Sequence, residues 1–144
     1  MKYLGFDLGT KTLGVSISDR NAVIALPLTT IRYNENDYDY LLNQINRIIE
    51  EEKPDRIVLG LPKNMNNTLG ERAQNSLDFK KLLENKFNLD VIMQDERLST
   101  VEVHKFLIDK DVTRKKRKKV VDKMASQIIL QSYLDMINNS RKEI

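Results

Sequence analysis

The stretch YLGFDLGTKTLGVSIS, from Tyr3 to Ser18, predicts a β-hairpin that carries an acid in its first strand. An apolar run and an alternating run flank Gly9-Thr10-Lys11-Thr12, whose residue types suit a tight turn. Asp7 lies in the first run, although aspartate is disfavoured in strands and a buried carboxylate without a partner is costly. Asp7 is therefore either a ligand for a divalent metal ion or a strand-end residue that ties down the turn through an Asx-type hydrogen bond.

The composition limits the chemistry that the chain can carry out. Its 144 residues are the size of one domain, and 40% hydrophobic with 31% charged residues is typical of an ordered globular protein. There is no cysteine and one histidine, His104, which excludes disulfides and thiolate metal sites and disfavours an all-protein zinc site. A hard cation with oxygen ligands remains open. Without a membrane-length apolar run or a signal peptide, we expect a cytoplasmic protein with no membrane partner.

A block of six consecutive cations contrasts with a formal net charge of only +3 at pH 7. Basic runs favour nucleic acid as a partner, because neutralising phosphates releases condensed counterions. The alternative is a solvated basic loop that binds nothing. The block consists of Arg114, Lys115, Lys116, Arg117, Lys118 and Lys119 and lies just before the expected final helix.

Hydrophobic periodicity and turn residues predict an α/β protein with the element order β-β-β-α-β-α-β-α-α. Pro27 places an edge or a bulge in the third strand, and Pro54 ends the first helix. We expect a single domain over residues 1–139 and a short flexible tail over 140–144. After the hairpin, the expected elements are a strand at 23–31, a helix at about 41–53, a strand at 56–61, a helix at 68–87, a strand at 90–96, and helices at 99–108 and about 118–137.

Local signals also predict where two of these helices begin and which face the last one buries. Thr68 and Glu71 have capping-box spacing, as do Ser99 and Glu102. The expected core face of the last helix consists of Val121, Met124, Ala125 and Ile128, and Asp122 lies just beside that face.

Three acids, Asp7, Glu96 and Asp122, lie at positions where the expected strand or helix does not favour an acidic residue. Ligand sites of open α/β sheets lie at the carboxyl ends of the strands, which brings Asp7 and Glu96 together and allows a packed helix to add Asp122. Crowded carboxylates repel one another unless a proton or a cation neutralises them, and Mg²⁺ or Mn²⁺ does so with oxygen coordination. Such a cluster hydrolyses phosphodiesters, with two metal ions activating water and stabilising the leaving oxygen.

Each acid also has an ordinary structural interpretation. Glu96 is either a ligand or an exposed strand-end carboxylate paired with Arg97. Asp122 is either a ligand or a helix carboxylate in an i,i+4 relation with Lys118. The residues alone leave both interpretations open.

Four blocks of this sequence together resemble the YqgF/RuvX family, known as Holliday junction resolvases and as ribosomal-RNA precursor nucleases. The blocks occur in the order and spacing of that family and cover nearly the whole chain. Asn67 and Ser126 depart from residues frequent in the family, but neither departure removes an acid. The blocks are GFDLGTKTLGVSISD, VLGLPKNMNNT, DERLST and KRKKVVDKMASQIILQSYLD.

This resemblance implies an RNase H-like fold, with a central mixed five-stranded sheet whose first three strands are antiparallel, flanked by helices. It also implies a metal-dependent endonuclease with Mg²⁺ or Mn²⁺ as cofactor, in which Asp7, Glu96 and Asp122 are both the catalytic residues and the metal ligands. The cellular role that it favours is processing of the 5′ end of pre-16S rRNA. Resolution of Holliday junctions in branched DNA is the alternative, because fold similarity is a weak guide to substrate.

Other polar residues are candidates for contacts with the nucleic acid, and each has an alternative as a turn, surface or ion-pair residue. We favour the basic block as an element that binds the nucleic-acid backbone, because it leads directly into the helix that bears Asp122. The candidates are Lys11, Asn64, Asn66, Arg72, Arg97, Arg114, Lys115, Lys116, Arg117, Lys118 and Lys119.

Two rival functions share the same sequence features. The Asp-Leu-Gly-Thr turn also occurs in the sugar-kinase, Hsp70 and actin superfamily, but those proteins enclose a nucleotide between two RNase H-like domains and this chain has room for one. A noncatalytic nucleic-acid-binding module is the second rival, which the presence of all three acids disfavours. We expect a monomer or a weak homodimer, and a monomer argues against a two-fold symmetric junction as substrate.

Overall fold

The computed structural model describes residues 1–62, 69–96, 108, 110 and 113–142, and for residues 117–123 and 141–142 it describes the backbone alone. The predicted helix at 99–108 lies almost wholly outside the described residues. None of the described helices is long and apolar enough to cross a membrane.

A mixed five-stranded sheet forms the centre of the protein, with the strand order β3-β2-β1-β4-β5. β2 runs antiparallel to both β1 and β3, whereas β4 runs parallel to β1 and β5 runs parallel to β4. This arrangement confirms the predicted RNase H-like sheet, including its antiparallel first three strands. The strands are β1 (Tyr3–Leu8), β2 (Thr12–Ser18), β3 (Ala25–Arg32), β4 (Arg56–Leu61) and β5 (Asp90–Asp95).

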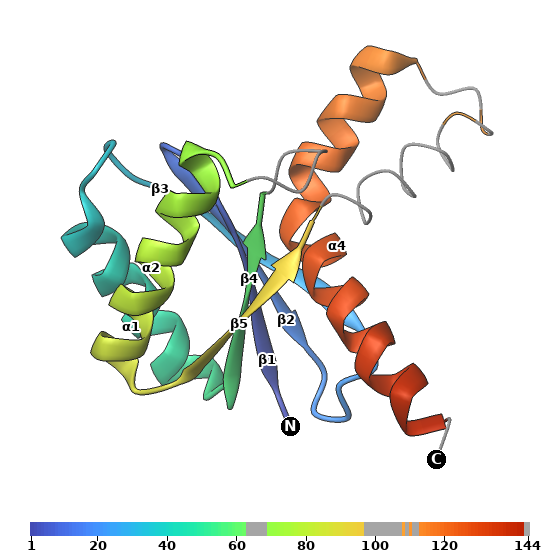
Figure 1. Ribbon diagram of the computed structural model, residues 1–144, viewed down its shortest axis with the longest axis horizontal. Coiled ribbons are helices and arrows are strands. Elements are labelled where there is room, and N and C mark those ends of the chain that lie inside the picture. Colours follow the sequence, from blue (N-terminus) through green and yellow to red (C-terminus); the bar gives the residue numbers. More distant parts are fainter. Residues whose placement is uncertain (63–68, 97–107, 109, 111–112, 143–144) are drawn as a thin grey trace.

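Helices cover both faces of the sheet (Figure 1). α1 (Tyr38–Glu52) and α2 (Glu71–Phe87) lie on one face, above a core that includes Leu4 and Phe6. α4 (Arg114–Lys142) crosses the other face and packs on a smaller cluster that includes Tyr3. Successive residues of β1 thus enter opposite cores, because strand side chains alternate between the two faces of a sheet.

β3 is an edge strand, as Pro27 predicts, and the pairing of β3 with β2 shifts register opposite Val15 and Ser16. α4 binds the start of this strand through side-chain amides. Gln131 accepts a hydrogen bond from the Ala25 N–H at 2.8 Å, and Gln127 donates to the Ala25 carbonyl at 3.0 Å. These bonds satisfy backbone groups at the edge that no further strand covers.

The final helix differs from its prediction in length and in phase. It begins at Arg114 and ends at Lys142, so the basic block forms its first turns and residues 140–142 of the expected tail are helical. Its buried positions are Ser126, Ile129, Leu130, Tyr133 and Leu134, whereas Met124 is 37% exposed. The apolar residues alone predicted the wrong phase, because the sheet beneath the helix presents glycines and Ser16, and the small Ser126 packs there.

The start of α2 also differs from its prediction. The helix begins at Glu71 with Gly70 as its N-cap, rather than at Thr68. Gly70 adopts an extended backbone and its carbonyl accepts a hydrogen bond from the Gln74 N–H at 3.1 Å. Glycine is tolerated at this position because an extended backbone is what an N-cap requires.

α4 approaches β1 very closely at Gly5. A Cβ atom at this position would lie 2.7 Å from the Leu130 Cβ and 3.1 Å from the Ser126 carbonyl oxygen. The Ser16 hydroxyl donates a hydrogen bond to the same carbonyl at 2.8 Å, which joins β2 to the helix in the core. The helix therefore rests on backbone rather than on side chains at this point.

We expect Gly5→Ala to lower the free energy of unfolding by about 1–3 kcal/mol, because the methyl group pushes α4 off the sheet. Gly14→Ala is the matched control, since a Cβ at Gly14 would meet Ser126 at ordinary contact distances of 3.4 and 3.5 Å. Urea unfolding measures both variants. Equal losses for the two glycines would contradict the close packing at Gly5.

Candidate active site

Asp7 lies near the carboxyl end of β1, where it pairs with Gly14 of β2 and is half-buried. Gly14 leaves open space beside it, since a Cβ there would lie 3.7 Å from the Asp7 Cβ and 3.4 Å from the Ser126 hydroxyl. The Asp7 side chain therefore lies on the face of the sheet that α4 covers. Asp7 thus lies within β1, one residue before the strand ends, and not in the turn.

Glu96 directly follows β5, and its backbone N–H donates a hydrogen bond to the Leu61 carbonyl of β4 at 3.4 Å. A Cβ at Gly60 would lie 2.6 Å from the Glu96 Oε2 atom and 2.6 Å from Ile129 of α4. The carboxylate thus passes over Gly60, on the same face as Asp7. Since β4 lies between β5 and β1, the missing side chain at Gly60 is what lets Glu96 reach toward Asp7.

The electrostatics of Glu96 follow from this position. Burial and then the negative charge of Asp7 raise its pKa from the ordinary 4.5 to about 7, although the Arg72 guanidinium opposes both effects. Two carboxylates therefore share one partly desolvated place, with a cation nearby. Strongly shifted acids of this kind are typical of functional sites.

The third predicted acid lies on α4, one helical turn before Ser126. Because Ser126 packs against Gly14, opposite Asp7, the backbone of this turn lies near the same end of the sheet. Figure 1 shows that α4 continues toward its own N-terminus past the carboxyl ends of β1 and β4. The side chain of Asp122 is outside the described atoms, and the described side chains include no group of three or more acids or histidines that could hold a metal ion.

The predicted nucleic-acid contacts separate into three groups. Lys11 is exposed in the hairpin turn, and Arg72 is exposed in the first turn of α2 close to Glu96. Arg114, Lys115 and Lys116 are exposed in the first turn of α4, whereas of Arg117, Lys118 and Lys119 only the helical backbone is described. Asn64, Asn66 and Arg97 lie outside the described residues.

Tyr33 holds the hairpin turn in place, a role that the sequence patterns did not suggest. Its hydroxyl donates a hydrogen bond to the Gly9 carbonyl, and its backbone N–H donates to the Lys11 carbonyl at 3.0 Å. Burial, followed by the nearby Tyr38 and Glu35, raises the pKa of Tyr33 to about 12, so the phenol stays a donor. Tyr33, the residue directly after β3, therefore holds the turn that follows Asp7 in place through two hydrogen bonds.

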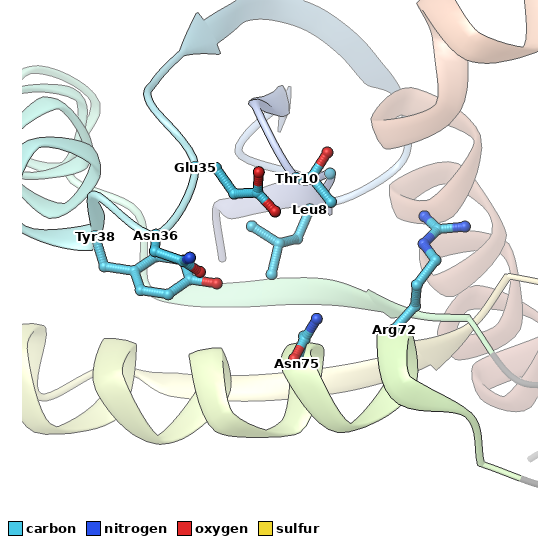
Figure 2. A pocket seen from close by; sticks show the side chains of 8 residues that line it. Leu8, Thr10, Glu35, Asn36, Tyr38, Arg72 and Asn75 are labelled. Atoms are coloured by element: carbon cyan, nitrogen blue, oxygen red, sulfur yellow. The ribbon is translucent and has the colours of Figure 1, made fainter.

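A small pocket lies at the same end of the sheet as the acids but on the face that α1 and α2 cover, between this turn, the loop after β3 and the first turns of α2 (Figure 2). Leu8 and Gly9 belong to its wall and follow Asp7 directly in the chain. Sequence patterns missed this pocket, because its polar residues come from separate segments that only the fold brings together. Those residues are Thr10, Glu35, Asn36, Tyr38, Arg72 and Asn75.

Comparison with solved structures supports the fold that this geometry indicates. The structure named "T. thermophilus RuvC in complex with Holliday junction substrate" superposes with a TM-score of 0.50 and 12% identity, over 72% of this chain and 69% of that chain. The structure of a protein named a putative N-acetylmannosamine kinase, from Listeria monocytogenes, also reaches 0.50, with 19% identity, over 74% of this chain and 39% of that chain. At these identities the likeness shows a shared fold alone.

Sequence relationships are much closer. A family model described as "RuvX: Holliday junction resolvase" matches residues 1–136. A Bacillus subtilis protein named "Putative pre-16S rRNA nuclease" is 51% identical over 138 residues, which cover 96% of this chain and all of the relative. A Geobacillus protein of the same name is 54% identical over 135 residues, covering 94% of this chain and 98% of the relative. With this coverage by the model and by both relatives, the chain belongs to the RuvX family of nucleases.

Proposed function

We propose that this protein is a divalent-metal-dependent endonuclease that processes the 5′ end of pre-16S rRNA, with Asp7, Glu96 and Asp122 as its catalytic residues. The observation that carries the proposal is the Glu96 carboxylate, which lies over Gly60 and shares its surroundings with Asp7. The names of relatives about half identical to this chain support the rRNA precursor as substrate.

The donor set fits a hard divalent cation. Two carboxylates in one partly buried place repel each other, and a raised pKa at Glu96 means that the metal-free protein retains a proton there near neutral pH. Mg²⁺ or Mn²⁺ neutralises such a pair through the oxygen ligands that these ions prefer. Asp7 and Glu96 would hold the ion, with Asp122 as the ligand from α4. When bound, the ion supplies Lewis acidity and activates water for attack on the phosphodiester.

The surrounding cations orient the substrate. Arg72, close enough to Glu96 to lower its pKa, is placed to hold the scissile phosphate beside the acids. The first turn of α4 exposes Arg114, Lys115 and Lys116, which attract the phosphate backbone. A strand held by both groups crosses the carboxyl end of the sheet over Asp7.

Holliday junction resolution is the second candidate, because it is the activity in the description of the matching family model. A four-way junction has two-fold symmetry and suits a dimeric enzyme. A monomer that cuts precursor RNA therefore supports the first function, whereas paired symmetric nicks in a junction support the second.

We expect Asp7→Asn and Glu96→Gln each to lower metal-dependent cleavage by at least roughly 100-fold, the scale for losing a group that stabilises charge in the transition state. Asp90→Asn, at the opposite end of β5, should retain activity. The assay uses a labelled precursor-rRNA fragment and a labelled four-way DNA junction, with Mg²⁺, Mn²⁺ or a chelator. Binding of both substrates without cleavage at any metal concentration would instead support a noncatalytic binding module.

Stability of the metal-free protein should depend on pH through Glu96. Its folded-state pKa of about 7 exceeds the ordinary 4.5, so the associated stability is present below pH 4.5 and is lost as the pH rises through 7. The full loss is roughly 3 kcal/mol. Relative to Glu96→Gln, which cannot ionise, the wild type should weaken between about pH 4.5 and 7 in urea unfolding, and Mg²⁺ should reverse most of that weakening. A constant difference between the two proteins across this range would contradict the buried site.

Salt dependence tests the basic turn of α4. We expect Lys115→Ala/Lys116→Ala to weaken RNA binding and to reduce the slope of log affinity against log salt by about 1–2, because each phosphate contact contributes about 0.7–0.9. Lys81→Ala/Lys86→Ala is the matched control, since both lysines are exposed on α2. Equal effects of the two double variants would show general electrostatics rather than a binding element.

A further inference from the structure

The pocket at this end of the sheet contains one acid, Glu35, that has no part in the proposed cleavage or phosphate binding. Figure 2 shows Arg72 on one side, with Asn36 and Tyr38 on the other, and Glu35 and Asn75 reaching in from different elements. Arg72 also lies in the surroundings of Glu96, so one side of the pocket continues into the proposed active site. Glu35 is exposed and forms no salt bridge with any described residue.

The pocket and the acids meet at the carboxyl end of β1. Gly9, in the pocket wall, is two residues beyond Asp7, which limits the separation of their backbones to about 7 Å. Leu8 faces the α1 and α2 side with the pocket, whereas Asp7 faces α4. A strand whose scissile phosphate lies over Asp7 and Glu96 therefore reaches the pocket by crossing this edge of the sheet beside Gly9 and Arg72. The hydrogen bonds from Tyr33 to Gly9 and Lys11 hold the turn that forms the pocket wall in one position.

We propose that this pocket receives the ribose of the nucleotide next to the scissile phosphate, and that Glu35 accepts a hydrogen bond from its 2′-hydroxyl. The enzyme would thereby distinguish RNA from DNA at this nucleotide, since deoxyribose lacks that donor. The inference rests on the nuclease function proposed above and deepens it by naming the sugar as the selected group.

Charge favours a ribose over a phosphate at this place. The cavity volume is about 60 Å³, several times the roughly 10–15 Å³ needed for one water-sized group, so a sugar has room in it. A carboxylate repels a phosphate but pairs well with a hydroxyl donor. Asn36, Asn75 and Thr10 add neutral hydrogen-bonding groups around the same space, and Tyr38 adds an apolar ring.

The first experiment replaces single ribonucleotides by 2′-deoxynucleotides on both sides of the mapped cleavage site in a short RNA substrate. For the wild type, one flanking replacement should lower kcat/KM by at least about tenfold, the effect of losing one hydrogen bond to a charged acceptor. For Glu35→Ala the same replacement should change kcat/KM little, and Glu35→Gln should restore part of the difference. Glu51→Ala, exposed at the opposite end of α1, should behave as the wild type.

An abasic ribonucleotide at the sensitive position separates the sugar from the base. If Glu35→Ala has its full effect on the abasic substrate, the contact is to the ribose. Loss of the Glu35 dependence on this substrate assigns the contact to the base and overturns the proposal. Equal sensitivity of wild type and Glu35→Ala to every 2′-deoxy replacement overturns it as well.

Binding provides a readout that does not depend on cleavage. In the Asp7→Asn background, fluorescence anisotropy compares single-stranded RNA with DNA of the same sequence, with and without Glu35→Ala. We expect a preference for RNA that Glu35→Ala removes. If no substrate is cut but this preference exists, the nuclease proposal fails and sugar recognition stands; if cleavage occurs but RNA and DNA bind and react equally, only sugar recognition fails.

Discussion

Three glycines on one face of the central sheet are the constraint on which the rest of the structure depends. Gly5, Gly14 and Gly60 lie on three adjacent strands, and each leaves the space that a neighbouring group occupies. Over Gly5, α4 packs directly on the backbone of β1 and receives the hydrogen bond from Ser16. Over Gly60, the Glu96 carboxylate crosses β4. The same shallow surface thus positions both the helix and the acid.

This arrangement places the Glu96 carboxylate beside Asp7 in a partly buried position, which does not favour folding when both acids are ionised. Burial and Asp7 both disfavour ionisation of Glu96, and Arg72 offsets only part of that effect. An acid under such conditions is a source of instability at neutral pH until a cation or a proton neutralises it. In the proposed function, a bound divalent cation would neutralise these acids and offset that instability.

The hairpin turn connects the proposed catalytic acid Asp7 with the proposed sugar pocket. Asp7 precedes it, Tyr33 anchors it, and its Gly9 and Thr10 border the pocket that contains Glu35. Any displacement of this turn would move the acid and the pocket wall together. That coupling explains why a buried tyrosine with a strongly raised pKa is placed at the end of β3 rather than an apolar residue of similar size.

The sequence by itself determined the elements of the fold and the identity of the acids. Hydrophobic patterns of period two and period 3.6 placed the strands and the first helix nearly where the structure has them, and Gly9, Pro27 and Pro54 marked turns and ends. These signals are reliable because they act between residues close in the chain. The resemblance to a known family then supplied a mixed five-stranded sheet whose first three strands are antiparallel. The start of α2 and the length and buried face of α4 were wrong, since caps and packing depend on what lies opposite.

Only the tertiary structure decided how distant residues meet. Glu96 reaches toward Asp7 because β4 lies between their strands and carries Gly60 at the crossing point. The pocket of Glu35, Arg72 and Asn75 joins a loop to a helix more than thirty residues away, and no local pattern relates them. The shifted pKa of Glu96 follows from burial and from neighbours contributed by other elements. Such properties depend on side-chain packing across the sheet, which a linear pattern of residues does not contain.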